Sequence, residues 1–296
     1  MQYKQLCFFI LGLSAGICCM AQQKNSISTN TLLWKISGNG LKTPSYLFGT
    51  VHVLCEEDAR LSSQAKKIIQ DVHSIWFEAD LDDAQEALGA IQQMNMKEGV
   101  TLKSLLSAEE YAKVSAYFEK SGQAAVFDRM QNFKPLVLAT LMQVKGLGCQ
   151  NTTAMERVIM SEASKFGKEI NGLETLASQL AIFDSIPYEV QAKQLLNVVS
   201  EEYDIHRETL KLMQAYKKQD LRTIDSITHD KKWGISAYQD ILIDRRNADW
   251  LTKMEALMPQ HPLLFAVGAG HLPGRQGLLR LLGEAGYTVS PLDNRN

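Results

Sequence analysis

The chain has 296 residues, of which 45% are hydrophobic and 22% are charged, a composition typical of a folded globular protein. This composition excludes a disordered chain and a collagen-like chain. The 31 basic and 33 acidic residues give a net charge of -2, and no basic run interleaved with aromatic residues is present to track a phosphate backbone. We therefore expect no nucleic-acid partner.

The first 21 residues have the pattern of an export signal. Lys4 gives a positive start, residues 6–13 (LCFFILGL) form a short apolar run, and residues 19–21 (CMA) suit a cleavage site. The run is too short to span a bilayer comfortably, and no later segment reaches about 18 uninterrupted apolar residues. We expect a signal peptide at 1–21, a polar tether at 22–31, and a mature periplasmic or secreted protein with no stable membrane span.

Three of the five cysteines lie in the predicted signal, which leaves Cys55 and Cys149 in the mature chain. Two cysteines are too few for a disulfide scaffold, and the sequence does not show whether their Cα atoms come close enough to pair. We interpret them as two small buried apolar residues. Cys18 and Cys19 lie at the depth of a lipid-modified cysteine, but the bulky residue before each disfavours lipidation.

The fold begins near residue 32 with a predicted β-hairpin and a strand–helix–strand unit. The hairpin has one strand at 33–37 (LWKIS), a glycine-containing turn at 38–40 (GNG) and a second strand at 44–48 (PSYLF). Apolar residues at helical spacing predict a helix over 60–72. Residues 74–80 (SIWFEAD) predict a short buried strand. The strand–helix–strand order suggests a βαβ unit whose strands pair in parallel.

Between about residues 82 and 257 the pattern is mostly helical, with few glycines and almost no strand runs. The exception is 168–174 (KEINGLE), a predicted short strand that ends at Glu174. Helices are predicted at 82–96, 108–120, 134–145, 153–166, 188–213 and 220–227. We interpret this stretch as a helical cap inserted into one α/β core.

The C-terminal part returns to strand and turn patterns. Residues 262–267 (PLLFAV) predict a buried strand, followed by a turn at 268–271, a helix at 276–285 and a last strand at 287–291. The predicted fold class is therefore α/β, with a mixed sheet core and the helical cap between its N- and C-terminal sheet segments. One domain would cover residues 32–292.

The motif Gly-x-x-His follows two of the buried strands, at 49–52 and again at 268–271. Because functional crevices of open α/β sheets lie beyond the carboxyl ends of the strands, we expect His52 and His271 to share one crevice with Glu78. Two imidazoles and a carboxylate suit a divalent metal ion such as Zn, Mn, Co or Fe. A single Gly-x-x-His also arises by chance, and the alternative interpretation of Glu78 is a surface acid at a strand end.

At these residues the chain resembles the TraB/GumN family. The motifs that carry the resemblance are SYLFGTVH at 45–52, WFEAD at 76–80, GLET at 172–175 with Gln179, Arg246 with Asn247, and FAVGAGHLPG at 265–274. The Tiki members of this family are metal-dependent peptidases with two Gly-x-x-His motifs and an acid, so the resemblance implies an active centre of His52, Glu78 and His271. One motif departs from the family: many members carry Gly-x-Asp where this chain has TAME at 153–156, so no role is assigned to Glu156.

The predicted function is metal-assisted hydrolysis of a peptide or small-molecule substrate by an exported protein. The two histidines would be metal ligands, and Glu78 either a third ligand or the general base. Arg246 is a candidate for stabilising developing negative charge, with Asn247 and Glu174 orienting the ligands.

Two alternatives stay open. Arg246 can instead form an ordinary salt bridge at the end of a helix predicted over 238–244. The whole protein can instead be a non-catalytic binding protein that keeps the family fold and sequesters a ligand between sheet and cap. The sequence indicates no particular oligomeric state.

Overall fold

The computed structural model describes residues 30–80, 83–143, 147, 149–200, 205–230 and 236–295. The predicted signal peptide at 1–21 and most of the predicted tether at 22–31 lie outside this set. Within it, no helix has both the length and the apolar character that a bilayer crossing requires.

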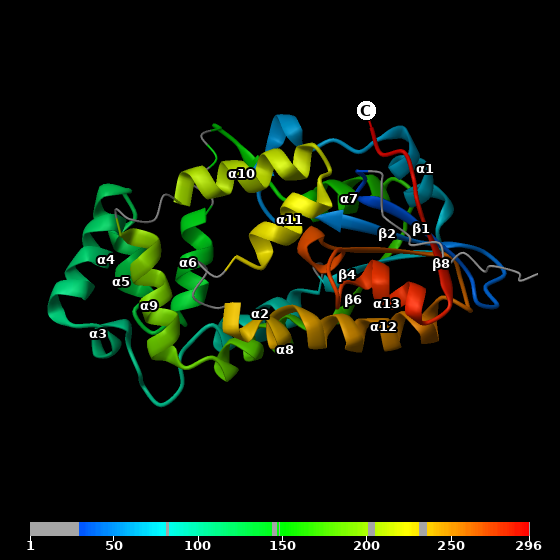
Figure 1. Cartoon of the computed structure of the whole chain (residues 1–296). Coiled ribbons are helices and arrows are strands. Elements are labelled where there is room, and N and C mark those ends of the chain that lie inside the picture. The colour runs from blue at the N-terminus through cyan, green and yellow to red at the C-terminus, as the bar shows by residue number, and fades with distance from the viewer. Residues whose placement is uncertain are drawn as a thin grey trace, which may run out of the picture.

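A six-stranded mixed sheet forms the centre of the fold (Figure 1). Its strands run in the order β6 (Glu169–Glu174), β4 (Ser74–Ala79), β7 (Leu263–Gly268), β2 (Ser45–Thr50), β1 (Leu33–Gly38) and β8 (Tyr287–Pro291). The first four are mutually parallel, whereas β1 is antiparallel to both β2 and β8. The predicted α/β class with a mixed sheet is confirmed.

The predicted hairpin is formed by β1 and β2, but the predicted pairing within the strand–helix–strand unit is wrong. β2 and β4 run in parallel without touching, because β7 lies between them and pairs with both. The reason is the burial of β7, whose first five residues (LLFAV) are all buried. A strand this apolar is most stable when it is flanked by a strand on each edge and covered on both faces.

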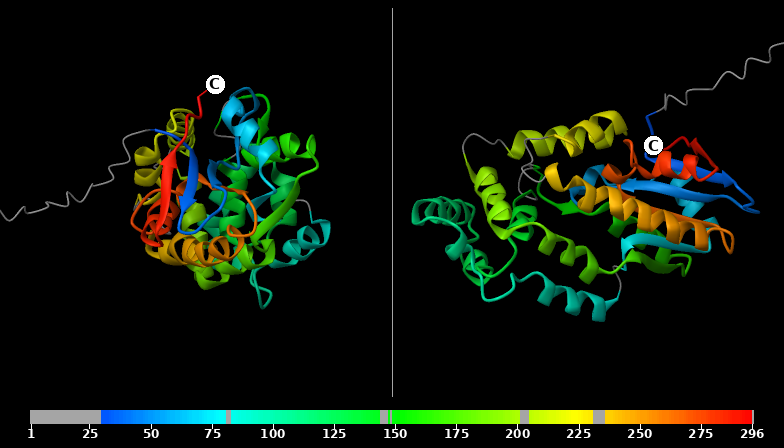
Figure 2. Two further views of the ribbon diagram at one scale, coloured as in Figure 1. Left: turned by 90° about the vertical axis from the view of Figure 1, so that its right-hand side faces the viewer. Right: turned by 60° about the horizontal axis from the view of Figure 1, so that its bottom comes forward.

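Helices cover both faces of the sheet (Figures 1 and 2), with α12 and α13 on one side and α1 and α7 on the other. The helices are α1 (Ser63–Asp71), α2 (Ala84–Gln93), α3 (Leu102–Leu105), α4 (Ala108–Lys120), α5 (Ala124–Arg129), α6 (Pro135–Gln143), α7 (Met155–Ser164), α8 (Leu176–Ile182), α9 (Tyr188–Val199), α10 (Ile205–Lys217), α11 (Leu221–Thr228), α12 (Arg245–Leu257) and α13 (Leu278–Glu284). Some of their ends are set locally: the Ser62 side chain accepts from the amide of Ala65 at the start of α1.

The segment predicted as a helical cap, about residues 82–257, contributes to two apolar cores. Helices α3, α4, α5, α6 and α9 lie at one end of the molecule (Figure 1) and contribute a separate apolar core, in which Phe118 stacks on Phe127 at 4.7 Å. In contrast, β6 joins the sheet, and buried residues of α7 and α12 belong to the main core. The helical pattern of the sequence does not show which of the two cores a helix joins, because a helix in either core buries one apolar face.

Two helices differ from the predictions. The helix predicted over 188–213 is two helices, because Ser200 is extended at the end of α9 and α10 begins at Ile205. The helix predicted over 238–244 is a short π-helical segment, Asp240–Asp244, that leads directly into α12. Arg246 therefore lies in the first turn of a 13-residue helix and not at the end of a short one.

The prediction of two unpaired buried cysteines is wrong, since Cys55 and Cys149 form a disulfide with a Cα–Cα distance of 5.8 Å. The short ladder between β3 (Leu54–Cys55) and β5 (Thr152–Thr153) brings the two chain segments together. The bond closes a sequence separation of 94 residues, and only the tertiary structure brings its two ends together.

Candidate active site

The two histidine motifs and Glu78 lie at one edge of the sheet. His52 follows the end of β2 and His271 follows the end of β7, while Glu78 is the penultimate residue of β4. Because β2 and β4 flank β7 in parallel, all three carboxyl ends meet at the same edge. The Nε2 atom of His271 lies 3.8 Å from Oε1 of Glu78.

A glycine leaves room between these groups. A Cβ atom placed on Gly268 would lie 2.9 Å from Oε1 of Glu78, 3.6 Å from Cδ2 of His271 and 4.0 Å from Nε2 of His52. The three predicted residues therefore converge on the open side of Gly268. The first residue of the second Gly-x-x-His motif is small because any side chain would fill the space that they share.

His271 is buried in one defined tautomer. Its Nδ1 atom lies 2.7 Å from Oδ1 of Asn247, whose Nδ2 donates to the carbonyl oxygens of His271 and Gln276. Since both amide hydrogens of Asn247 are used, its oxygen must accept, and Nδ1 of His271 carries the proton. Burial, with the nearby charge of Arg246, lowers the pKa of His271 to about 3, so its Nε2 atom keeps a lone pair.

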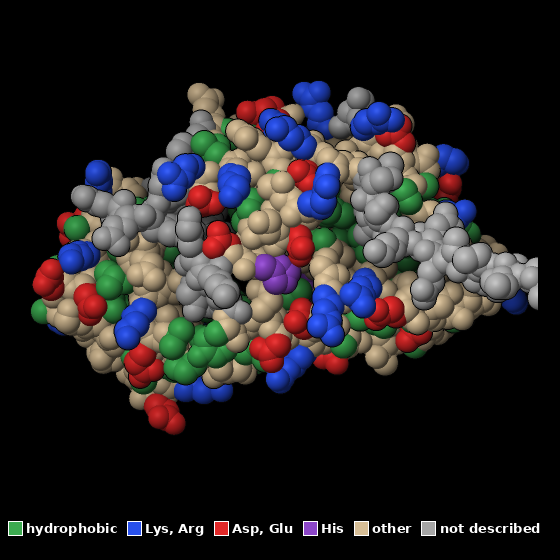
Figure 3. Space-filling view, in the orientation of Figure 1, with side chains coloured by type: hydrophobic (Ala, Val, Ile, Leu, Met, Phe, Trp, Pro, Cys, Tyr) green, Lys and Arg blue, Asp and Glu red, His purple; other side chains and the backbone are tan. Residues whose placement is uncertain are grey.

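His52 is held in a similar way but at the surface. Its Nδ1 atom lies 2.8 Å from Oε1 of Glu156, and the hydroxyl of Thr50 donates to the same oxygen at 2.6 Å. The hydrogen bond and charge of Glu156 raise the pKa of His52 to about 9. The side chain is 67% exposed, and histidine atoms reach the surface near the middle of the face shown in Figure 3.

Glu156 was noted in the sequence only as a departure from the family motif, and its contact with His52 was missed. A signal for it exists: Glu156 shares the buried face of α7 with Ile159 and Ala163, at helical spacing. A carboxylate on an apolar face needs a partner, because burying it unpaired is costly. One oxygen has the two donors above, whereas Oε2 is buried with no hydrogen-bond partner among the described residues.

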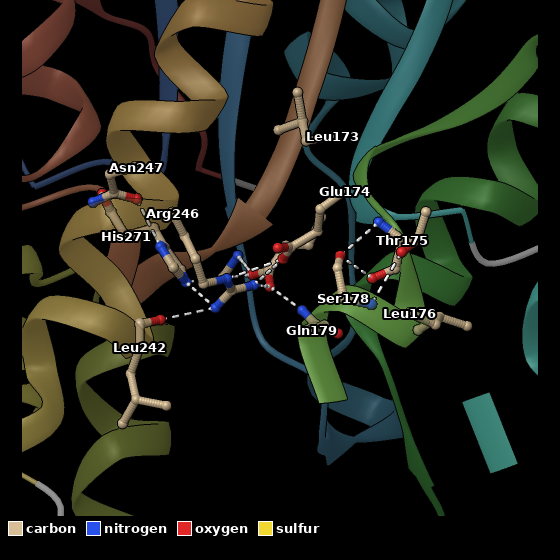
Figure 4. A network of polar contacts seen from close by, with 12 residues as sticks. Leu173, Glu174, Thr175, Leu176, Ser178, Gln179, Leu242, Arg246, Asn247 and His271 are labelled. Atoms are coloured by element: carbon tan, nitrogen blue, oxygen red, sulfur yellow. Dashed lines mark hydrogen bonds and ion pairs between the residues drawn. The ribbon is translucent and has the colours of Figure 1, made fainter. Parts of the chain in front are cut away.

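Arg246 is saturated by the protein (Figure 4). Its Nε and Nη2 groups donate to Glu174, Nη2 also donates to Glu78 at 2.6 Å, and Nη1 donates to the Leu242 carbonyl at 3.0 Å. The second Nη1 hydrogen faces Nε2 of His271 at 3.2 Å. All five N–H groups of the guanidinium thus have acceptors, so Arg246 has no donor to spare for a substrate in this state.

Glu78 is buried and fully partnered, as expected for an acid behind an apolar strand. Oε1 accepts the amide of Gly268 at 2.7 Å, and Oε2 accepts Arg246 at 2.6 Å and Nε2 of Gln179 at 2.8 Å. Burial opposes ionisation, but the charges of Arg246 and His52 and the amide of Gly268 outweigh it and lower the pKa of Glu78 to about 2. The surface-acid interpretation of Glu78 is therefore wrong.

Glu174 and Tyr216 contact Arg246 and the first Gly-x-x-His motif, respectively. Glu174, the last residue of β6, binds Arg246, and burial raises its pKa although the guanidinium opposes the shift. Tyr216 was not predicted; it is buried in α10 and donates to the carbonyl oxygen of Gly49 at 3.1 Å. It therefore holds the backbone at the start of the first Gly-x-x-His motif.

The described residues contain no group of three His, Cys, Asp or Glu side chains already arranged to hold a metal ion. His52, Glu78 and His271 surround a common space, but Arg246 lies against the Nε2 atom of His271. Two other described histidines contact each other: His73 stacks on His261 at 4.0 Å.

Comparisons with known proteins find one family profile and several distant relatives. The sequence profile of the TraB/PrgY/gumN family matches residues 32–291. The chain is 22% identical to Metalloprotease TIKI2 of Danio rerio, over 88% of this chain and 60% of the relative. It is 21% identical to the Metalloprotease TIKI homolog of Amphimedon queenslandica, over 90% of this chain and 62% of the relative. The chain thus spans about three fifths of the length of these relatives. No solved structure matches it significantly.

Proposed function

This chain belongs to the TraB/PrgY/gumN family, and from that premise we propose that it is an exported, metal-dependent hydrolase that cleaves peptides. The observation that carries the proposal is the similar way in which the two motif histidines are oriented. Each Nδ1 atom faces an oxygen acceptor, Glu156 for His52 and Asn247 for His271. The Nε2 atom of His52 then lies beside Gly268, and the Nε2 atom of His271 lies 3.8 Å from Oε1 of Glu78. Metal-binding histidines are oriented by such acceptors.

The donor set fits a divalent metal ion. Two imidazole Nε2 atoms and one ionised carboxylate are the ligand types that zinc and similar ions prefer, and the missing Cβ of Gly268 leaves space between them. When bound there, such an ion would polarise a scissile carbonyl and lower the pKa of a water molecule. Arg246 would have to leave Nε2 of His271 for that atom to become a ligand, and His52, whose pKa Glu156 raises to about 9, would have to lose its Nε2 proton.

Of the two roles considered for Glu78, the contacts favour that of ligand over general base. A carboxylate whose pKa is lowered to about 2 accepts a proton poorly, since a general base works best with a pKa near the operating pH. Its oxygens also accept from Gly268, Arg246 and Gln179, which hold the carboxylate in place. Glu78 would then contribute charge and position, not proton transfer.

Arg246 and Glu174 act in the proposal as positioning residues. Arg246 joins Glu78, Glu174 and His271 through one planar group, so it holds the ends of β4 and β6 against the turn after β7. It also lies over the ring of Trp250, 4.6 Å from its centroid. These contacts favour a positioning role over direct stabilisation of a developing charge.

Export is supported by two independent features of the chain. The N-terminal 21 residues have the pattern of a signal peptide, and the mature part carries the Cys55–Cys149 disulfide. Disulfides persist in oxidising compartments such as the periplasm or the extracellular space and are rare in the cytosol.

A binding protein without turnover is the second candidate function. It is favoured by the saturated state of Arg246 and by the lack, among the described residues, of a preformed three-residue metal cluster. Such a protein would keep the same site without needing to release the guanidinium from His271.

One experiment separates the two candidates. The mature protein, residues 22–296, is purified without added metal, analysed for bound elements and incubated with a peptide library with and without a chelator. The metallohydrolase predicts bound metal, chelator-sensitive cleavage, and loss of both in the double variant His52→Ala/His271→Ala. The control variant His261→Ala changes a histidine stacked on His73 and should behave as wild type. Peptide binding without cleavage under every metal condition would favour the binding protein.

A further inference from the structure

A basic groove lies on the side of α7 that faces away from the candidate active site. It has a volume of about 530 Å³, and its lining includes Arg60, Lys66, Arg157 and Lys165. Glu156, which contacts His52, lies on the buried face of the same helix. The groove is therefore separate from the proposed hydrolytic centre.

The positive charge of the groove is only partly compensated. Lys165 is paired with Glu162 at 2.6 Å, and Glu162 is the one acid in the lining. Among the residues that the structure describes, no carboxylate lies within ion-pairing distance of Arg60, Lys66 or Arg157. Three positive charges thus remain, on a chain whose net charge is -2.

The chemistry of the cations favours an oxyanion. Arg60 donates through Nε to the carbonyl of Glu57, which fixes its guanidinium and leaves the Nη groups available. Arg157 has no hydrogen-bond or ion-pair partner in the described part of the chain. Guanidinium groups bind phosphate through two parallel hydrogen bonds, and a lysine adds a point charge. A monoanionic carboxylate would leave more of the charge uncompensated than a phosphate monoester, which carries about -1.5 to -2 at pH 7.

We propose that this groove binds a phosphate-bearing ligand. Arg60, Lys66 and Arg157 bind the phosphate, while the apolar side chains of Leu61 and Val158 line the groove beside them. A soluble phosphate compound and the headgroup of an anionic phospholipid offer the same chemistry. The proposal concerns binding alone and does not depend on hydrolysis at the histidine site.

The test uses the mature protein with two probes, at low salt. Inorganic phosphate is titrated by calorimetry against chloride at equal ionic strength, and co-sedimentation is measured with vesicles of phosphatidylglycerol or of phosphatidylcholine. Lys66→Gln and Arg157→Gln are each expected to weaken binding about tenfold, because each removes a charged hydrogen bond. Lys67→Gln is the matched control: this neighbouring lysine is paired with Asp71 at 2.9 Å, and its loss should leave binding unchanged.

Each outcome decides the proposal. Binding of inorganic phosphate that Lys66→Gln and Arg157→Gln weaken supports the proposal and identifies a soluble ligand. Binding only to phosphatidylglycerol vesicles, weakened by the same two variants, supports the proposal and identifies a lipid headgroup. Equal losses in Lys67→Gln and the groove variants would show a non-specific charge effect and overturn it. Failure of both probes to bind would overturn it as well, whatever the hydrolytic activity.

Discussion

Replacing Gly268 with alanine is a direct test of the candidate centre. The backbone at Gly268 has φ -50° and ψ 133°, which alanine adopts without strain, so the change acts only through its methyl group. That methyl would lie 2.9 Å from Oε1 of Glu78, whereas ordinary contact begins at 3.4 Å. The carboxylate must move by about 0.5 Å, the difference between these two distances, and it is tied to Arg246 and Gln179.

The displacement weakens the hydrogen bond from the Gly268 amide to Glu78, now 2.7 Å long, and strains the groups that hold the carboxylate. Overpacking and a damaged charged hydrogen bond each cost on the order of 1–3 kcal/mol, so we expect a loss of about 2 kcal/mol in the free energy of unfolding. If the site hydrolyses peptides, the displaced carboxylate should reduce kcat/KM by about 100-fold.

Urea unfolding, calorimetric metal titration and peptide hydrolysis are measured on Gly268→Ala and on Gly283→Ala. Gly283 lies in α13, and a Cβ there meets nothing within 4 Å, so alanine should stabilise that helix by about 0.5–1 kcal/mol. If Gly268→Ala is as stable as Gly283→Ala and keeps its metal affinity and activity, the three groups do not share the space beside Gly268, and the proposed centre is wrong.

Three further predictions concern the disulfide, a buried lysine and the exposed histidine. The double variant Cys55→Ala/Cys149→Ala should lose about 4 kcal/mol of stability, because the bond closes a 94-residue separation, and its melting temperature should no longer respond to dithiothreitol. Lys134→Met should lower the free energy of urea unfolding by about 1 kcal/mol, because the fully buried ammonium group ion-pairs with Asp184 at 2.8 Å, while Asp184 keeps a second partner, Lys97, at 2.9 Å; an unchanged value would contradict this account. Glu156 raises the pKa of His52 from 6.5 to about 9, so the stability from this pair is complete below pH 6.5 and is lost as the pH rises through 9. Because His52 is exposed, we expect only about 1 kcal/mol, seen as a decline in wild-type stability across that pH range that His52→Ala lacks.

Features that depend on neighbouring residues could be predicted from the sequence. Short runs of alternating or uninterrupted apolar residues predicted the strands β1, β2, β4, β7 and β8, and the short strand predicted over 168–174 is β6. The helix over 108–120 was predicted at the observed bounds from its helical pattern, and in the structure Ser107 and Glu110 form a capping box at its start. The repeated Gly-x-x-His motif marked His52 and His271 because both follow strands that end at one edge.

Features that join distant segments were decided only by the tertiary structure. The place of β7 between β2 and β4 depends on burial over the whole sheet, which a local pattern does not encode. The pairs Cys55–Cys149 and His52–Glu156 join residues about a hundred positions apart, and only the fold brings them into contact. The motif at Arg246 led to the prediction that this residue stabilises developing negative charge. In the structure, its guanidinium is instead surrounded by acceptors from the ends of β4 and β6 and from the turn after β7. Sequence patterns thus identified the chemical groups, and packing determined which of them meet and how many of their hydrogen bonds are already used.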